Sequence, residues 1–128
     1  MGESKAKTIT SWILQVLLAL LFLAAASGKL LGNPQIKEMF EVWGYSATFV
    51  LVIGVLELAG AVGLLIPRTA GLAALGLIGV MIGAAYTHLA NAEGLQVLRP
   101  LIFMALLAGV VWLRRPWPFR GRSRPESA

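Results

Sequence analysis

The stretch that decides the fold is ATFVLVIGVLELAGAVGLLI, residues 47–66. Apart from Thr48 and Glu57 it contains only apolar residues and glycine. About 20 such residues are enough for an α-helix to cross the hydrocarbon core of a bilayer. The stretch therefore predicts a transmembrane helix that carries one carboxyl group near its middle.

Glu57 has two interpretations at that depth. A charged side chain near the centre of a membrane costs about 2.5 kcal/mol or more, so it needs a partner, a proton or a water-filled pocket. This cost favours a functional site. Polar side chains also hydrogen-bond between membrane helices, so the residue can instead serve only to lock two helices together.

Three further apolar runs, at 9–31, 70–89 and 97–113, also have the length of a spanning helix. Hydrophobic residues make up 58% of the 128-residue chain and charged residues 13%, which leaves little material for a soluble domain. Nothing alternates apolar with polar as a membrane β-barrel requires. We predict an all-α membrane protein, a four-transmembrane-helix bundle over 9–113, between an N-terminal tail (1–8) and a basic C-terminal tail (114–128).

The first run also has features of a secretory signal. Lys5 and Lys7 precede it, and it ends in the small residues Ala-Ala-Ala-Ser at 24–27. Cleavage there would leave an odd number of spans, which fits the distribution of charge less well. We therefore expect the first span to be retained.

Positively charged residues predict the orientation, since loops rich in Lys and Arg stay on the cytoplasmic side. Eight of the eleven lie on one side of a four-span chain: Lys5, Lys7, Arg68, Arg114, Arg115, Arg120, Arg122 and Arg124. Lys29, Lys37 and Arg99 fall on the other. Both termini are predicted to be cytoplasmic. The basic tail follows a span directly, so topology and anionic lipid headgroups account for it without nucleic acid as a partner.

The chain has no cysteine and a single histidine, His88. Thiolate catalysis, iron–sulfur ligation and cysteine-held zinc are therefore excluded. One histidine with one intramembrane glutamate is a poor set of metal ligands, so no metal site is predicted.

Small residues indicate where helix backbones approach each other. Gly54 and Gly60 flank Glu57 in the second predicted span, and the third carries Gly76, Gly79 and Gly83, the last two in G-x-x-x-G spacing. We predict that these glycines pack the second and third spans together as antiparallel neighbours. The same face can pack between two copies, so a homo-oligomer stays open.

Thr69 stands in the short turn between these two spans. Threonine often caps a helix by accepting a hydrogen bond from a first-turn amide. We predict that Thr69 is the N-cap of the third span.

The remaining polar residues of the spans gather on the predicted outer side. Lys29 ends the first span, Tyr86 and His88 end the third, and Arg99 begins the fourth. Lys29 can extend to the membrane surface or make a contact inside the bundle. His88 is either an ordinary interfacial residue or part of a proton relay, since histidine titrates near neutral pH.

With Glu57, these four residues predict a cavity that opens outward and ends at Glu57. Apolar walls and a polar mouth suit an amphipathic lipophile, either a quinone or a lipid-like molecule. No cofactor is certain from these residues, and a quinone is the candidate.

Four segments carry a family resemblance: GKL at 28–30, GVLEL at 54–58, LIPRTA at 65–70 and MIGAAYTH at 81–88. Because these segments occur in this order within four spans, the chain resembles the DoxX-like membrane proteins and, more distantly, DoxX and the quinone-linked DoxD proteins. The resemblance covers about 9–113 and implies a four-helix protein of the bacterial inner membrane. DoxD-type relatives are associated with thiosulfate oxidation coupled to quinone reduction, and DoxX-type relatives with membrane oxidoreductase assemblies.

Three functions remain open. The chain can be an accessory subunit that binds a quinone or similar lipophile beside a membrane redox partner, a non-catalytic scaffold or assembly factor, or a small carrier of protons or solute. No internal repeat of the kind common in transporters is visible, so the carrier ranks last. Without a soluble redox domain or a cofactor fingerprint, we do not expect an independent enzyme.

Overall fold

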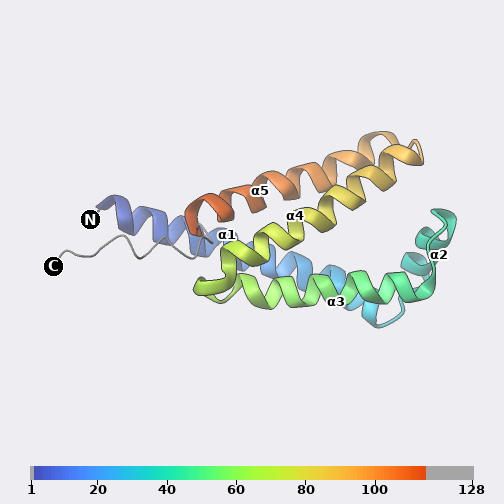
Figure 1. The fold of residues 1–128 in the computed structure, drawn as a ribbon, viewed down its shortest axis with the longest axis horizontal. Coiled ribbons are helices and arrows are strands. Elements are labelled where there is room, and N and C mark those ends of the chain that lie inside the picture. The colour runs from blue at the N-terminus through green and yellow to red at the C-terminus, as the bar shows by residue number, and fades with distance from the viewer. Residues whose placement is uncertain (1, 115–128) are drawn as a thin grey trace.

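The computed structural model describes residues 2–114, which form five α-helices and one 3-10 helix (Figure 1). In chain order these are α1 (Gly2–Leu30), α2 (Pro34–Val42), α3 (Ala47–Leu64), α4 (Pro67–Ala90), η1 (Gly94–Val97) and α5 (Leu98–Arg114). Residues 2–8, predicted as a tail, continue α1. The predicted basic tail lies outside the described residues except for Arg114, which ends α5.

Four of the helical segments are long and apolar enough to cross a membrane: Lys5–Leu30, Ala47–Leu64, Pro67–Ala90 and Gly94–Arg114. Large apolar side chains are exposed along all of them, among them Leu20, Val55, Leu72 and Ile102. Such a surface is costly in water and suits contact with lipid tails. The prediction of an all-α protein with four helices long and apolar enough to span a membrane is confirmed.

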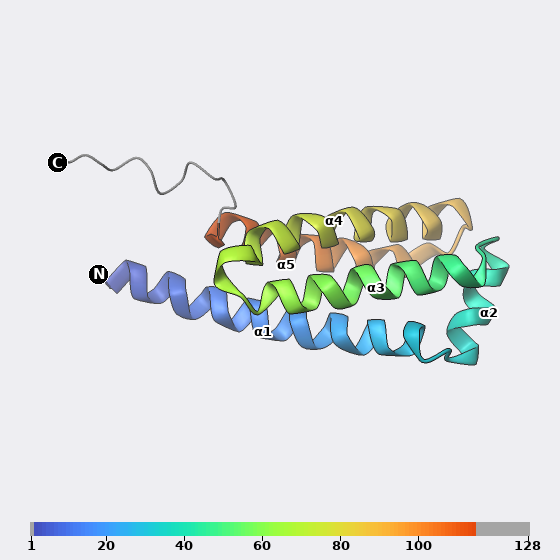
Figure 2. The ribbon, with the colours of Figure 1, turned by 60° about the horizontal axis from the view of Figure 1, so that its bottom comes forward.

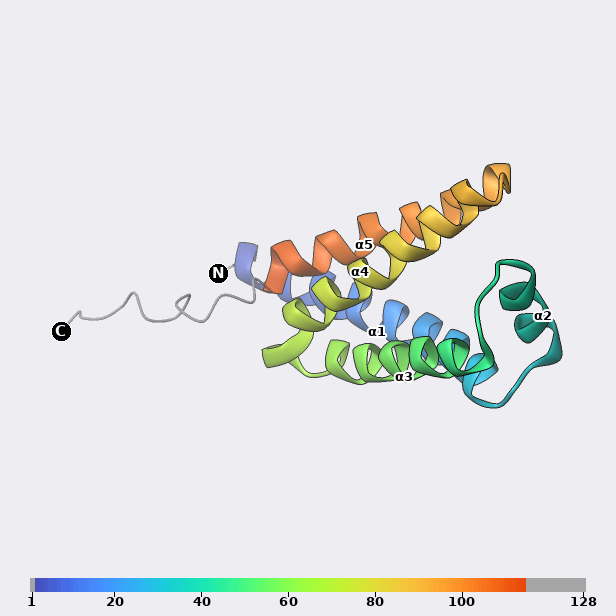
Figure 3. The same ribbon diagram turned by 45° about the vertical axis from the view of Figure 1, so that its right-hand side comes forward.

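The four long helices pair as α1 with α3 and α4 with α5. Both ends of the described chain and the α3–α4 turn lie at one end of the bundle, here named the terminal end (Figure 2). α2 and the α4–α5 connection lie at the opposite end, named the α2 end (Figure 2). The two pairs are close together at the terminal end and diverge toward the α2 end (Figures 1 and 3).

Small residues allow α3 and α4 to touch near the terminal end. A Cβ built at Gly60 would lie 2.6 Å from the Leu77 side chain, and one at Gly63 would lie 2.8 Å from the Cβ of Ala73. The neighbouring side chains of Leu64 and Leu107 are fully buried. The core is therefore closely packed near Gly60 and Gly63, because glycine has no side chain that would hold the two helix pairs apart.

A buried amide joins three helices at the same end. Gln15 of α1 is fully buried, and its Nε2 donates to the carbonyl of Leu64 over 2.6 Å. Its Oε1 accepts from Ser11 Oγ at 2.7 Å and from Arg114 Nε at 2.8 Å. Because buried polar groups are costly without partners, this network favours one arrangement of α1, α3 and α5.

Thr69 does not cap α4 as predicted. α4 begins with Pro67 after Ile66, and Thr69 Oγ1 donates to the carbonyls of Gly63, at 2.9 Å, and Ile66, at 3.3 Å. Proline at the first helical position has no amide hydrogen to satisfy, so the helix starts three residues earlier than a threonine cap would place it. The hydroxyl instead closes the end of α3.

Three helices end with the same hydrogen-bonded turn, in which one residue adopts a positive φ. That residue is Gly32 after α1 (φ 76°), Gly44 after α2 (φ 90°) and Ala92 after α4 (φ 52°). In each case the next amide bonds back to a carbonyl five residues earlier, as Glu93 N does to His88 O at 2.9 Å. These turns set the directions in which the chain enters and leaves α2 and leaves α4.

Candidate functional site

A pocket of about 610 Å³ lies between the diverging helix pairs at the α2 end. α1, α3, α4 and α5 supply its walls, and α2 with the residues that follow it borders its mouth. Phe22 of α1 and Phe103 of α5 meet edge to face in its wall, with ring centroids 5.4 Å apart. Most other lining residues are apolar, and the volume is typical of sites that hold small molecules.

Lys29 and Glu57 are the charged groups that lie deepest in the pocket. Lys29 Nζ is 2.9 Å from Glu57 Oε1, and the two side chains are 13% and 4% exposed. Glu57 lies about 16 Å along α3 from its N-cap, Ser46, at 1.5 Å per residue. The carboxylate thus has the cationic partner that its depth requires, and the ion pair joins α1 to α3.

Of the five glycines that we predicted to pack helices together, some lie against another helix and some do not. Gly60 faces Leu77 of α4, as predicted, whereas Gly54 packs against α1 and not α4: a Cβ at Gly54 would be 3.0 Å from Leu30. The remaining three require a correction. A Cβ at Gly76, Gly79 or Gly83 would meet no atom of the described chain within 4 Å, and all three residues line the pocket.

The correction has a simple physical reason. α3 and α4 touch where Gly60 meets Leu77 but separate toward the α2 end (Figure 1), so Gly79 and Gly83, farther along α4, face open space, as does Gly76 beside Leu77. Their missing side chains enlarge the pocket and do not bring helices together.

The mouth of the pocket contains a cluster of aromatic rings. Phe40 of α2 lies within 6.4 Å of Trp43, Tyr45 and Phe49, measured between ring centroids. The Trp43 ring also meets His88 of α4 edge to face, at 5.4 Å and 89°. The segment that follows α2 is thus packed against the last turns of α4.

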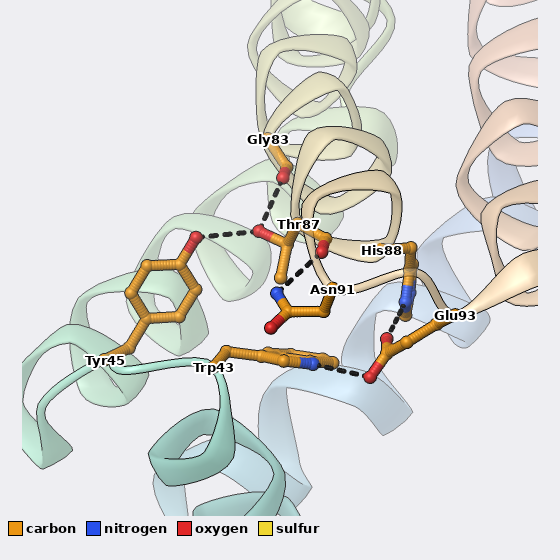
Figure 4. A network of polar contacts seen from close by, with 7 residues as sticks. All are labelled: Trp43, Tyr45, Gly83, Thr87, His88, Asn91 and Glu93. Atoms are coloured by element: carbon orange, nitrogen blue, oxygen red, sulfur yellow. Dashed lines mark hydrogen bonds and ion pairs between the residues drawn. The ribbon is translucent and has the colours of Figure 1, made fainter.

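Glu93 bonds to both Trp43 and His88 (Figure 4). Trp43 Nε1 donates to Glu93 Oε2 over 2.8 Å, and His88 Nδ1 lies 2.6 Å from Glu93 Oε1. The hydrogen bond from Trp43 and then the one from His88 lower the pKa of Glu93 below its usual value. The group at the mouth is therefore a carboxylate at neutral pH.

Tyr45 and Thr87 form a second link across the mouth (Figure 4). Tyr45 Oη lies 2.7 Å from Thr87 Oγ1, and Thr87 Oγ1 donates to the carbonyl of Gly83 at 2.9 Å. Since the threonine proton is used there, the tyrosine hydroxyl is the donor to Thr87. Two polar contacts thus connect the residues after α2 to the far end of α4.

The structure places four of the five predicted site residues on one pocket. Lys29, Glu57, His88 and Arg99 all line it. Tyr86 does not line it, and its side chain is 67% exposed. Arg99 is exposed at the mouth and makes no hydrogen bond or ion pair with the other residues of 2–114. No group of three or more metal-ligating side chains occurs within that range.

Sequence reasoning missed α2 and the residues that bind across the mouth, namely Trp43, Tyr45, Thr87 and Glu93. One available signal was Asn33-Pro34, since asparagine followed by proline commonly begins a helix. Asn33 Oδ1 indeed accepts from the amides of Gln35 and Ile36. The aromatic residues at 40, 43, 45 and 49 were a second signal.

Comparison with known protein families identifies a relationship. The model of the DoxX-like family matches residues 13–110, which contain the whole pocket. No curated protein and no solved structure matches the chain.

Proposed function

The chain belongs to the DoxX-like family, and we propose that it binds an amphipathic lipophile, a quinone being the candidate, as an accessory subunit of a membrane redox system. The observation that carries the proposal is the pocket of about 610 Å³ whose lining includes the Lys29–Glu57 ion pair. Its volume and largely apolar lining suit a ring with a hydrocarbon chain.

The polar groups of the pocket suit the head of such a ligand. Lys29 offers a donor at depth, and His88 and Arg99 offer polar groups at the mouth. Arg99 needs no partner from the described chain, so its guanidinium is available to a carbonyl or hydroxyl oxygen. The open face of Gly76, Gly79 and Gly83 leaves a smooth wall against which a flat ring fits.

The proposed setting is a bacterial inner membrane, with both termini in the cytoplasm and the α2 end outward. Arg68 and Arg114 lie at the terminal end, and Lys37 and Arg99 lie at the α2 end. Together with the Lys and Arg residues of the tails, this distribution follows the positive-inside rule. A lipophile would then reach the pocket from the outer half of the bilayer, where a redox partner would also meet it.

The Lys29–Glu57 ion pair also supports a second candidate, a scaffold without a ligand. The pair joins α1 to α3, which is all that a structural role requires. The two functions differ in what Glu57→Gln should do. A scaffold loses stability, whereas a binding protein also loses its ligand.

Native mass spectrometry with lipid extraction tests the proposal. We expect the wild type to retain a quinone or a lipid-like molecule and Glu57→Gln to lose it. Glu38→Gln is the matched control, because it makes the same change on the exposed side of α2. Gly79→Leu should also remove the ligand, since its side chain would fill pocket space while meeting no helix at Cβ.

A wild type that retains nothing would contradict ligand binding and favour the scaffold. A ligand kept by both Glu57→Gln and Gly79→Leu would place binding outside this pocket. His88→Ala tests the contribution of the mouth to ligand binding separately from that of the Lys29–Glu57 pair, because it removes a polar group at the mouth and leaves the ion pair intact.

A further inference from the structure

The contact between Glu93 and His88 determines which ring nitrogen of His88 carries a proton. Glu93 is a carboxylate that accepts from Trp43 through one oxygen, so it has no proton to give to His88. His88 Nδ1, 2.6 Å from the other oxygen, must then be the donor. In a neutral imidazole this leaves Nε2 as an acceptor with a free lone pair.

Contacts with neighbouring residues fix the orientation of the His88 ring and so the position of Nε2. The His88 ring packs edge to face against Trp43, and its side chain is only 13% exposed. The turn after α4 holds Glu93 in place, since the Glu93 amide bonds to the His88 carbonyl at 2.9 Å. Nε2 has no partner among residues 2–114, and the ring borders the pocket.

We infer that the Trp43–Glu93–His88 contact makes Nε2 of the neutral His88 ring a hydrogen-bond acceptor at the pocket mouth. The pocket therefore prefers a ligand whose polar head carries an O–H, such as a lipophilic hydroquinone or phenol, over the corresponding quinone, which has only acceptors. His88 touches the ligand and Glu93 is a positioning residue. This inference rests on the proposed function and adds which form of the ligand is bound more tightly.

Glu93→Gln reverses the hydrogen bonding without removing either contact. The glutamine oxygen can still accept from the Trp43 indole, while its amide N–H donates to His88 Nδ1. The proton of a neutral His88 then moves to Nε2, which becomes a donor. A hydroquinone loses its acceptor, and a quinone carbonyl gains a partner.

The test uses a short-chain benzoquinone and its hydroquinone, titrated separately into the full-length protein in nanodiscs, the hydroquinone under anaerobic reducing conditions. We expect the wild type to bind the hydroquinone more tightly. In Glu93→Gln the ratio of the two dissociation constants should change about tenfold toward the quinone, the size of one exchanged hydrogen bond. Glu38→Gln should leave the ratio unchanged.

Nitrogen-15 NMR supplies a readout that a purely structural role would not move. His88 is the one histidine of the chain, so its two ring nitrogens are assigned without ambiguity. At a pH where the spectrum shows a neutral ring, the wild type should carry its proton on Nδ1, and Glu93→Gln on Nε2. A wild-type ring protonated on Nε2 would overturn the inference.

His88→Phe keeps a ring beside Trp43 and removes both nitrogens, so it decides the matter if Glu93→Gln does not fold. We expect it to abolish the preference for the hydroquinone. An unchanged preference in this variant, or in a Glu93→Gln protein whose ring proton has moved, would overturn the inference. If neither probe binds the wild type, it is the proposed function that fails.

Discussion

Lys29 and Glu57 form an ion pair between α1 and α3, the two helices that pack together on one side of the pocket. Nζ and Oε1 are 2.9 Å apart, and the carboxylate is the more deeply buried partner. Lys29 stands in the last turn of α1, so its long side chain can reach toward the α2 end. When the ion pair is broken, Lys29 can therefore extend toward the α2 end, whereas Glu57 stays buried.

Lys29→Met should destabilise the protein more than Glu57→Gln. The first change leaves a buried carboxylate without a cation, which costs about 3 kcal/mol or more. The second leaves an ammonium group that can extend to the surface, so we expect about half that loss. Reversible unfolding in mixed detergent micelles measures both.

The double variant Lys29→Met/Glu57→Gln is the control for this asymmetry. It contains no buried charge, so it should be more stable than Lys29→Met alone. Strictly additive losses would show that the two residues do not stabilise each other.

The same substitution at two glycines should have opposite effects on stability. At Gly60 a new methyl group would lie 2.6 Å from the fully buried Leu77 side chain, so Gly60→Ala should cost about 1–3 kcal/mol. At Gly79 it would meet nothing within 4 Å, and alanine favours helix by up to about 1 kcal/mol. Gly79→Ala should therefore be neutral or stabilising. Equal losses in the two variants would mean that α4 packs closely along its whole length.

The contacts of Glu93 should weaken only in acid. Its pKa is lowered in the folded protein, so their contribution is complete above the usual glutamate pKa of about 4.3 and is lost as the pH falls through the lower, folded value. The indole N–H resonance of Trp43 reports this change directly. We expect its midpoint below the usual glutamate pKa, and no such transition in Glu93→Gln. A midpoint at or above the usual value would contradict the contact.

Ala92→Gly should stabilise the turn that holds Glu93. Ala92 has φ 52°, a conformation that costs a residue with a Cβ about 1–2 kcal/mol and costs glycine almost nothing. Allowing for the greater freedom of glycine in the unfolded chain, we expect a gain of about 0.5–1 kcal/mol in the free energy of unfolding. Ala85→Gly, the same change in the interior of α4, should be destabilising.

The spans were predictable because their signal is strong and local. Each is an apolar run of membrane length, and none depends on what its neighbours do. Lys29, Glu57, His88 and Arg99 were identifiable for a related reason: polar residues are rare in such runs, so each one stands out. The family resemblance is confirmed by the match over 13–110.

The rest of the site depends on relations that no single segment contains. Gly60 and Gly79 occur in similar surroundings in the sequence, and only the divergence of the helix pairs makes one a contact and the other a void. Glu93 lies in a loop, where its partners are set by a turn built on an alanine with positive φ. α2 has only nine residues, too few for apolar periodicity to distinguish it from a loop.

The divergence of the two helix pairs also bears on how the family could change over time. The residues that hold the bundle together, such as Gly60 and Leu77, lie at the terminal end, whereas Gly76, Gly79 and Gly83 face only the pocket. Substitution at those three positions would alter the size and shape of the pocket at little cost to the fold. The shape of the pocket can therefore change almost independently of stability in a chain of this design.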